Sequence, residues 1–348
     1  MKLRISKRIK VFLIGVSIIV LLYFVGTLED KLSDGLYTSI PSTETIKDVA
    51  SLCKTTLATS TTRIKGINVT EPTDPKSREL LSDLNVEWVR TDIHWERIEQ
   101  TPGEYDWSTY DEIFTEMNEK GISIAPIFSY IPSYLTNWQI IGDEYGQFVG
   151  LAALRYHQYG LHYYEIFNEP NLSGFGWLQY GIDPEPFINA YGLLLAKANI
   201  AIRTEDPHAV IILGGLSPNG YSADNFLNRI YDLGLAGCFD IVAYHPYGEE
   251  TRLKERAEEI RTIMTNNGDS EKPIWFNELG SNKVEDQERI MKVAFLDIDA
   301  VQGFFWFNLR DFKSPFEHYG LVDREYHTRS SYNLFKKLLE ELANQGKN

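Results

Sequence analysis

The chain has 348 residues, enough for one large domain or two ordinary ones. Hydrophobic residues make up 43% and charged residues 24%, which is normal for a folded protein with a sizeable core. The formal net charge of −15 excludes nucleic acid as an expected partner, because an acidic surface repels phosphate backbones. Neither composition nor charge indicates an oligomeric state.

The amino terminus predicts export. Residues 1–10, MKLRISKRIK, carry five basic side chains, and residues 11–26, VFLIGVSIIVLLYFVG, carry no charge. This apolar run is slightly shorter than the ~20 residues that span a bilayer and longer than the ~7–15 residues of a signal-peptide core. The basic residues are expected to stay in the cytoplasm. We therefore predict that residues 11–26 are a transmembrane signal anchor in the cell membrane and that the chain after residue 26 lies outside the cytoplasm. The alternative is a cleaved signal peptide and a secreted protein.

Residues 27–62 are rich in Ser and Thr and predict a linker with a short helix near 44–58. The chain has only two cysteines, Cys53 and Cys238, which excludes a disulfide scaffold and a cysteine zinc site. An exported protein could join them. Because Cys53 falls in the predicted linker, the sequence favours two unpaired thiols.

The segment 63–348 predicts one catalytic domain in which eight apolar runs alternate with helical patterns. The runs cover 64–69, 87–92, 122–130, 163–169, 209–215, 239–247, 273–280 and 303–311. Strands that alternate with helices predict a parallel sheet, and eight such units fit an α/β fold of the (β/α)₈ (TIM) barrel type. An open doubly wound sheet is less favoured because no Gly-rich G-x-G-x-x-G turn follows the first strand.

In such a barrel, the active site lies at the carboxyl ends of the strands. The predicted strand ends are polar and aromatic, and they place these candidates at the barrel mouth: Arg90, His94, Tyr130, Asn168, Glu169, His245, Tyr247, Glu278, Trp306 and Asn308. The letters FNE occur at the end of run 4 and near the end of run 7. Glu169 and Glu278 are therefore expected on opposite sides of the mouth.

A pair of carboxyl groups is what the cleavage of a glycosidic bond requires. One group protonates the leaving oxygen, and the other, ionised, attacks the sugar or activates water. Aromatic side chains offer flat faces for sugar rings. The histidines show no H-x-H or H-E-x-x-H spacing, so we expect no catalytic metal, and no motif indicates a cofactor.

Two motifs, EIFNEPN at 165–171 and WFNELG at 275–280, resemble the acid/base and nucleophile motifs of clan A retaining glycoside hydrolases. Residues 86–114, VEWVRTDIHWERIEQTPGEYDWSTYDEIF, are also typical of that clan. The chain is most similar to glycoside hydrolase family 39, which includes β-xylosidases, α-L-iduronidases and bacterial exopolysaccharide hydrolases. That family more often has Thr before the nucleophile, where this chain has Asn277.

The resemblance implies that Glu169 is the general acid/base and Glu278 the nucleophile. It implies that Asn168 binds the sugar 2-hydroxyl and that Trp306 is the platform under the reacting sugar. Either Tyr247 or His245 would lie beside Glu278.

Arg90 has two expected roles, as a partner of Glu278 or as a structural partner of the neighbouring Glu165. His94, Tyr130 and Asn308 are candidates for substrate contact, although a loop or core role is open for each of the first two.

The sequence thus predicts a retaining O-glycoside hydrolase that acts on an extracellular polysaccharide or oligosaccharide. A transglycosylase that remodels surface polysaccharide and a non-catalytic carbohydrate-binding protein on the same fold are the alternatives. The lack of a β-sandwich after residue 345 favours endo action over exo action, and the sequence does not identify the sugar.

Overall fold

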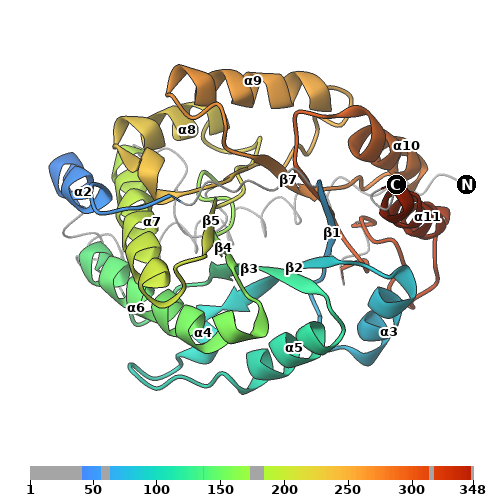
Figure 1. Ribbon diagram of the computed structural model, residues 1–348, viewed down its shortest axis with the longest axis horizontal. Coiled ribbons are helices and arrows are strands. Elements are labelled where there is room, and N and C mark those ends of the chain that lie inside the picture. Colours follow the sequence, from blue (N-terminus) through green and yellow to red (C-terminus); the bar gives the residue numbers. More distant parts are fainter. Residues whose placement is uncertain (1–40, 56–62, 136, 173–183, 313–316, 346–348) are drawn as a thin grey trace, which may run out of the picture.

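The computed structural model describes residues 41–55, 63–135, 137–172, 184–312 and 317–345. Eight parallel strands form one sheet in the order β5-β4-β3-β2-β1-β8-β7-β6, and a parallel bridge between Ile212 and Ile241 joins its two edges (Figure 1). The strands are β1 (Ile64–Asn68), β2 (Trp88–His94), β3 (Ser123–Ser129), β4 (Tyr163–Ile166), β5 (Val210–Leu213), β6 (Val242–Ala243), β7 (Ile274–Leu279) and β8 (Gly303–Trp306). The predicted (β/α)₈ barrel is confirmed.

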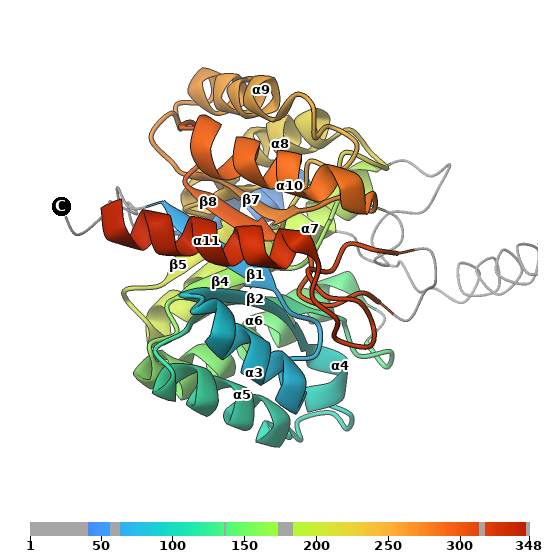
Figure 2. The ribbon, with the colours of Figure 1, turned by 90° about the vertical axis from the view of Figure 1, so that its right-hand side faces the viewer.

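Helices surround this barrel, and the side view in Figure 2 shows α11 across it and the β8–α11 connection at one end. Their bounds are α2 (Thr43–Ala50), α3 (Pro75–Leu84), α4 (Trp95–Ile98), α5 (Ser108–Glu119), α6 (Trp138–Tyr156), α7 (Glu185–Glu205), α8 (Ala223–Asp232), α9 (Leu253–Asn266), α10 (Val284–Lys292) and α11 (Ser330–Gln345). The segment after β3 forms the 19-residue α6.

Local signals in the sequence set several helix ends. Asp74 caps the first turn of α3 by accepting a hydrogen bond from the backbone of Lys76, and Pro75 occupies the first helical position. The same helix ends at Asn85, which has a φ of 53° in the left-handed region that Asn tolerates better than most residues. The helix is thus defined by its own residues before packing contributes.

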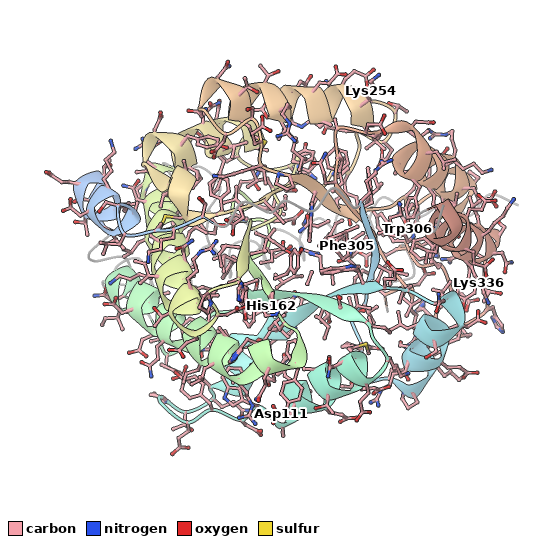
Figure 3. All side chains as sticks on the ribbon, viewed as in Figure 1. Asp111, His162, Lys254, Phe305, Trp306 and Lys336 are labelled. Atoms are coloured by element: carbon pink, nitrogen blue, oxygen red, sulfur yellow. A yellow bond between two sulfur atoms is a disulfide. The ribbon has the colours of Figure 1, made fainter. Side chains whose placement is uncertain are left out.

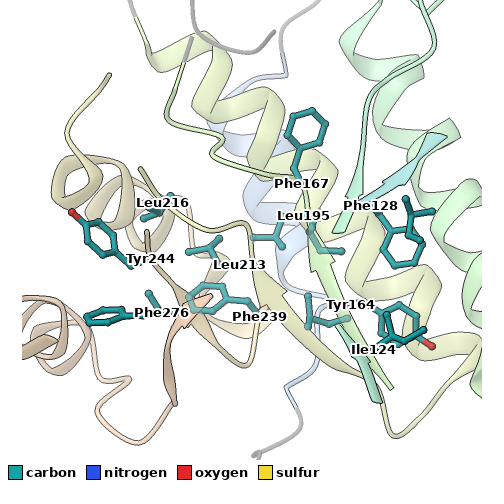
Figure 4. Close-up of a cluster of buried hydrophobic side chains, with 14 of the residues drawn as sticks. Ile124, Phe128, Tyr164, Phe167, Leu195, Leu213, Leu216, Phe239, Tyr244 and Phe276 are labelled. Carbon is teal, nitrogen blue, oxygen red and sulfur yellow. The ribbon is translucent and has the colours of Figure 1, made fainter. Parts of the chain in front are cut away.

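The core has two parts, as the fold requires. Inside the barrel, small and large apolar side chains form one cluster: Ile64, Ala125, Val210, Ile212, Ile241, Ala243, Trp275 and Phe305. A larger cluster fills the space between the strands and the helices, where Leu195 of α7 lies near Leu213 of β5 and Phe239 (Figure 4). Because the strands are buried on both sides, their sequences are nearly continuous apolar runs.

The predicted linker contributes a packed element to the domain. α2 begins at the Ser42 cap and lies beside α7, as Figure 1 shows at the edge of the barrel. Ile46 of α2 is fully buried, and Asn199 of α7 exchanges hydrogen bonds with both backbone groups of Lys54. The short helix predicted near 44–58 is therefore present, and it docks on the barrel.

Cys53 and Cys238 form a disulfide bond, so the expectation of two unpaired thiols is wrong. The docking of α2 carries Cys53 next to the segment before β6, a proximity that nothing in the linker sequence indicates. The bond closes a loop of 185 residues around more than half of the domain.

The predicted signal anchor at 11–26 and the basic segment before it lie outside the described residues. Within the described ranges, no helix combines the length and the apolar character needed to cross a membrane.

Candidate active site

A cavity of about 790 Å³ opens at the carboxyl ends of the strands, where the sequence placed the site. Most of the predicted residues line it: His94, Tyr130, Asn168, Glu169, Tyr247, Glu278 and Asn308. Arg90 and His245 are fully buried and contact the two glutamates from below the cavity surface. Trp306 is the predicted site residue that lies elsewhere.

Glu169 reaches the cavity through an irregular turn. β4 ends at Ile166, and Phe167 and Glu169 then adopt φ values of 68° and 41°. Such left-handed backbone is uncommon outside glycine and is held only where neighbouring structure enforces it. Here the backbone N–H of Glu169 donates to the carbonyl of Gly215 after β5, at 3.0 Å. The strand therefore does not simply continue to Glu169, as the sequence suggested, but turns its carboxyl group into the mouth.

Glu278 is presented by a break in the ladder between β7 and β8. The pairing shifts register between Phe276 and Leu279, so Asn277 and Glu278 lie in a bulge. Bulges bend a strand and redirect side chains, and they are frequent beside active sites. Asn68 at the end of β1 bridges this region by donating to the carbonyl oxygens of Asn277 and Trp306.

Arg90 contacts both glutamates that the sequence offered as alternative partners, Glu165 and Glu278. Its guanidinium donates to both carboxylate oxygens of Glu165 at 2.6 and 2.8 Å, and to Glu278 Oε1 at 2.6 Å. The same group also donates to the side-chain oxygens of Asn68 and Asn168. Both expected roles are therefore present in one residue.

Electrostatics keep Arg90 charged. Burial by itself lowers the pKa of the guanidinium, but the charges of Glu165 and Glu278 outweigh burial and raise the pKa above its ordinary value. A permanent positive charge thus lies directly beneath the Glu278 carboxylate.

His245 lies between the two cavity glutamates. Its Nδ1 is 3.0 Å from Glu169 Oε1 and 3.6 Å from Glu278 Oε2. The sum of these distances, about 6.6 Å, is the largest possible separation of the two carboxylate oxygens. This upper bound lies near the lower limit of ~6.5 Å for inverting glycosidases. The opposite ring nitrogen, Nε2, is buried and has no hydrogen-bond partner among the described residues. A proton must lie between Nδ1 and Glu169 Oε1, since two acceptor atoms 3.0 Å apart cannot form a hydrogen bond without one.

The Glu169–His245 pair shares one proton. Burial raises the pKa of Glu169, but the hydrogen bond and the charge of His245 lower it below its ordinary value. Burial lowers the pKa of His245, and the charge of Glu278 and the hydrogen bond to Glu169 raise it. The hydrogen bond thus holds a proton within reach of the cavity at the position of Glu169.

Gly214 and Gly215 explain why His245 can lie so deep. A side chain at Gly215 would place its Cβ 2.1 Å from His245 Nε2, so only glycine fits. The backbone N–H of Gly215 donates to Glu165 Oε1 at 3.1 Å. The glycine pair after the fifth strand therefore serves close packing around the site.

Aromatic side chains form the wall around Glu278. Tyr247 donates from its hydroxyl to Glu278 Oε2 at 2.9 Å, and its ring contacts Phe307 and Tyr319 edge to face. All three rings line the cavity. Neither Phe307 nor Tyr319 was predicted, although Phe307 directly follows the last strand.

Trp306 does not line the cavity, so its predicted role as a sugar platform is wrong. Side chains alternate along a strand, and in β8 Phe305 points into the barrel. Trp306 consequently points into the layer between strands and helices, where it is buried in the larger core cluster. Figure 3 shows Phe305 near the barrel centre and Trp306 displaced toward α10 and α11.

His94 and Tyr130 form a stacked pair at the edge of the cavity, with ring centroids 4.0 Å apart. Burial, and to a lesser extent the charge of Arg97, lower the pKa of His94 to about 4, so this ring is neutral at physiological pH. Asp92, which lies between Arg90 and His94 on β2, also lines the cavity.

The remaining polar residues divide between the cavity and its frame. Asn308 lines the cavity, and its side-chain nitrogen has no partner among the described residues. Asp311 accepts two hydrogen bonds from Arg329 and one from the backbone of Gly320, so it anchors the loop after β8. Within the described residues, no cluster of His, Cys, Asp and Glu has the arrangement of a metal site.

No protein-family profile and no curated protein matches the sequence. Solved structures do match. A family 39 glycoside hydrolase from the gut symbiont Bacteroides cellulosilyticus WH2 has a TM-score of 0.64 and 16% identity over 81% of this chain, which spans 64% of that protein. A family 39 β-xylosidase from Caulobacter crescentus has a TM-score of 0.60 and 17% identity over 80% of this chain and 71% of its own.

A family 1 β-glucosidase from Thermotoga maritima has a TM-score of 0.63 and 14% identity over 80% of this chain and 98% of its own. The expected resemblance to clan A glycoside hydrolases is therefore confirmed at the level of the fold. A shared barrel does not assign an activity, which depends on the site itself.

Proposed function

We propose that this protein is a retaining O-glycoside hydrolase that acts on an oligosaccharide or polysaccharide outside the cytoplasm. The observation that carries the proposal is the Glu169–Glu278 pair at the cavity floor, with oxygens no more than about 6.6 Å apart around His245. Retaining enzymes hold their carboxyl groups ~5–5.5 Å apart, whereas inverting enzymes need ~6.5–9.5 Å to admit a water molecule.

Glu278 is the nucleophile in this proposal. A nucleophilic carboxylate must be ionised and must have an oxygen directed at the sugar carbon. Arg90 supplies the compensating charge from below, and Tyr247 donates to the other oxygen. Asn168, held by Arg90, is placed beside the nucleophile, where its side-chain N–H₂ can donate to the 2-hydroxyl of the sugar.

Glu169 is the acid/base. The proton held between Glu169 Oε1 and His245 Nδ1 moves onto the glycosidic oxygen as the bond to the sugar breaks. The resulting carboxylate then removes a proton from the water that releases the sugar from Glu278. A single group thus acts as acid in the first step and as base in the second.

The substrate is a carbohydrate with apolar ring faces. Phe307, Tyr319 and the His94–Tyr130 stack provide flat surfaces around the carboxylates. Ligand cavities commonly measure ~300–1,000 Å³, and about 790 Å³ is in the upper part of this range. The volume supports a substrate of more than one sugar unit and favours endo action.

Two independent features support a site of action outside the cytoplasm. Residues 1–26 have the basic and apolar segments of a signal anchor or a signal peptide. The Cys53–Cys238 disulfide supports the same conclusion, since such bonds persist mainly in exported proteins. We therefore propose a catalytic domain held outside the cytoplasm, anchored to the cell membrane or secreted.

The test is hydrolysis of 4-nitrophenyl glycosides and polysaccharides by the wild type, Glu278→Ala and Glu169→Ala. Glu278→Ala should lose turnover and regain it with azide, a small anion that replaces the missing carboxylate and yields a glycosyl azide. Glu258→Ala, on the outer helix α9, is the matched control and should remain active. Sugar binding without turnover by the wild type would instead identify a carbohydrate-binding protein.

A further inference from the structure

Asp92 is a carboxylate in the cavity with no function in the chemistry described above. It lies on β2 on the same side as Arg90 and His94, because alternate residues of a strand share a face. It is two positions after Arg90 in the sequence, which places its backbone about 7 Å nearer the cavity mouth along the strand. Asp92 lines the cavity, whereas the Arg90 guanidinium that holds Glu278 is buried beneath the cavity surface.

Among the described residues, nothing donates a hydrogen bond to the Asp92 carboxylate, and no cation forms an ion pair with it. The nearby Arg90 directs its donors to Glu165, Glu278, Asn68 and Asn168. Asp92 is partly exposed, and its open side faces the cavity. A partly buried carboxylate without donors is costly, and a ligand that supplies donors removes that cost.

The surroundings of Asp92 identify what it can accept. The charged and titratable groups that act on it come from five elements: Arg90 on the same strand, Glu165 on β4, Glu278 on β7, Arg97 on α4 and Tyr110 on α5, with Tyr130 after β3. Glu278 and Glu165 disfavour any further negative charge here. Arg97 is exposed at the cavity edge, and Arg90 is already compensated by two glutamates.

We propose that Asp92 is a specificity-determining residue that accepts hydrogen bonds from the sugar unit bound at Glu278. The site then takes a sugar whose ring substituents are donors, hydroxyl or amino groups, and discriminates against a uronic acid or a sulfated sugar at this position. This inference rests on the proposed function. It names the substrate class for the unit next to the nucleophile.

The ionisation of Asp92 adds a pH dependence to binding. Burial raises the pKa of Asp92 to about 6, with the charges of Glu278 and Glu165 acting in the same direction and Arg90 opposing them. Protonation below pH 6 removes an acceptor and weakens the hydrogen bonds to the sugar. KM should therefore increase as the pH falls through 6.

The experiment compares wild type, Asp92→Asn and Asp92→Ala in the full chain on 4-nitrophenyl glycosides of neutral, amino and uronic sugars. Asp299→Asn is the matched control, since that side chain is 99% exposed. For neutral and amino sugars, both Asp92 variants should increase KM by roughly 10- to 100-fold, the value of a lost hydrogen bond to a charged group. The wild-type preference for neutral over uronic sugars should shrink, and the increase of KM below pH 6 should disappear.

Each outcome separates this inference from the proposed function. An active wild type with unchanged KM in Asp92→Asn, or a wild type that prefers uronides, overturns the inference and leaves the hydrolase in place. If the wild type hydrolyses nothing, binding of the corresponding free sugars is measured by calorimetry. Loss of that binding in Asp92→Asn, with normal thermal unfolding, supports the inference without the hydrolase; absence of sugar binding overturns both.

Discussion

Replacing Arg90 with Met should destabilise the protein more than any loss of packing explains. The side chain is buried and makes five hydrogen bonds, three of them to carboxylates. Met keeps most of the volume, so the main effect is to leave Glu165 buried without its counter-charge. Breaking a buried ion pair in this way costs about 3–5 kcal/mol of unfolding free energy.

The measurement is thermal and urea unfolding of Arg90→Met, Glu165→Gln and the double variant. For a domain of this size, 1 kcal/mol corresponds to about 2 °C, so Tm should fall by roughly 6–10 °C in Arg90→Met. The double variant should recover part of this loss, because the neutral amide no longer needs the cation. If the single and double variants unfold at the same temperature, Glu165 is not the group that Arg90 compensates.

Three further predictions concern other parts of the molecule. Reduction of Cys53–Cys238 with dithiothreitol should lower Tm markedly, since a 185-residue loop contributes up to about 5 kcal/mol; an unchanged Tm would mean that α2 docks without the bond. His245→Gln removes the group whose raised pKa keeps the Glu169–His245 pair protonated, so the alkaline limb of the kcat/KM profile should move to lower pH; an unmoved limb would show that the two groups are not coupled. Phe307→Ala should increase KM by about 10-fold or more if the ring binds sugar. Trp306→Phe should instead lower Tm with little change in KM, because Trp306 lies in the core. The reverse pattern would identify Trp306 as the sugar platform.

The barrel and its two glutamates could be predicted because each rests on a strong local pattern. The eight apolar runs alternate with helices along the whole domain, and the strands occur at those places. Glu169 and Glu278 lie at or near the ends of runs 4 and 7, and such positions lie at the barrel mouth whatever the exact register. Polarity at strand ends is therefore informative even when strand bounds are not.

The error at Trp306 has a simple physical cause. Residues 303–307 read GFFWF, and both sides of a barrel strand are apolar, so the sequence does not indicate which residues point inward. The inward position of Phe305 is set by pairing with β1 and β7. An assignment that is wrong by one residue exchanges the inward and outward sides of the strand. It therefore selects Trp306 as the aromatic residue of the cavity in place of Phe307.

Tertiary contacts account for the other features that the sequence did not provide. The bulge that presents Glu278 depends on the pairing of β7 with β8, and Asn68 supports it from β1. The partnership of Cys53 with Cys238 depends on the docking of α2. A practical consequence is that a fragment made for assays should begin before residue 41, since a start at the first strand would remove both α2 and Cys53.

The stereochemistry of the first product tests the central claim most directly. Wild-type enzyme is mixed with a 4-nitrophenyl glycoside that it cleaves, and the anomer released is followed by proton NMR before mutarotation. The assignment of Glu278 as nucleophile and Glu169 as acid/base predicts a product with the same anomeric configuration as the substrate. Release of the opposite anomer would contradict the assignment of Glu278 as nucleophile and with it the account of the site.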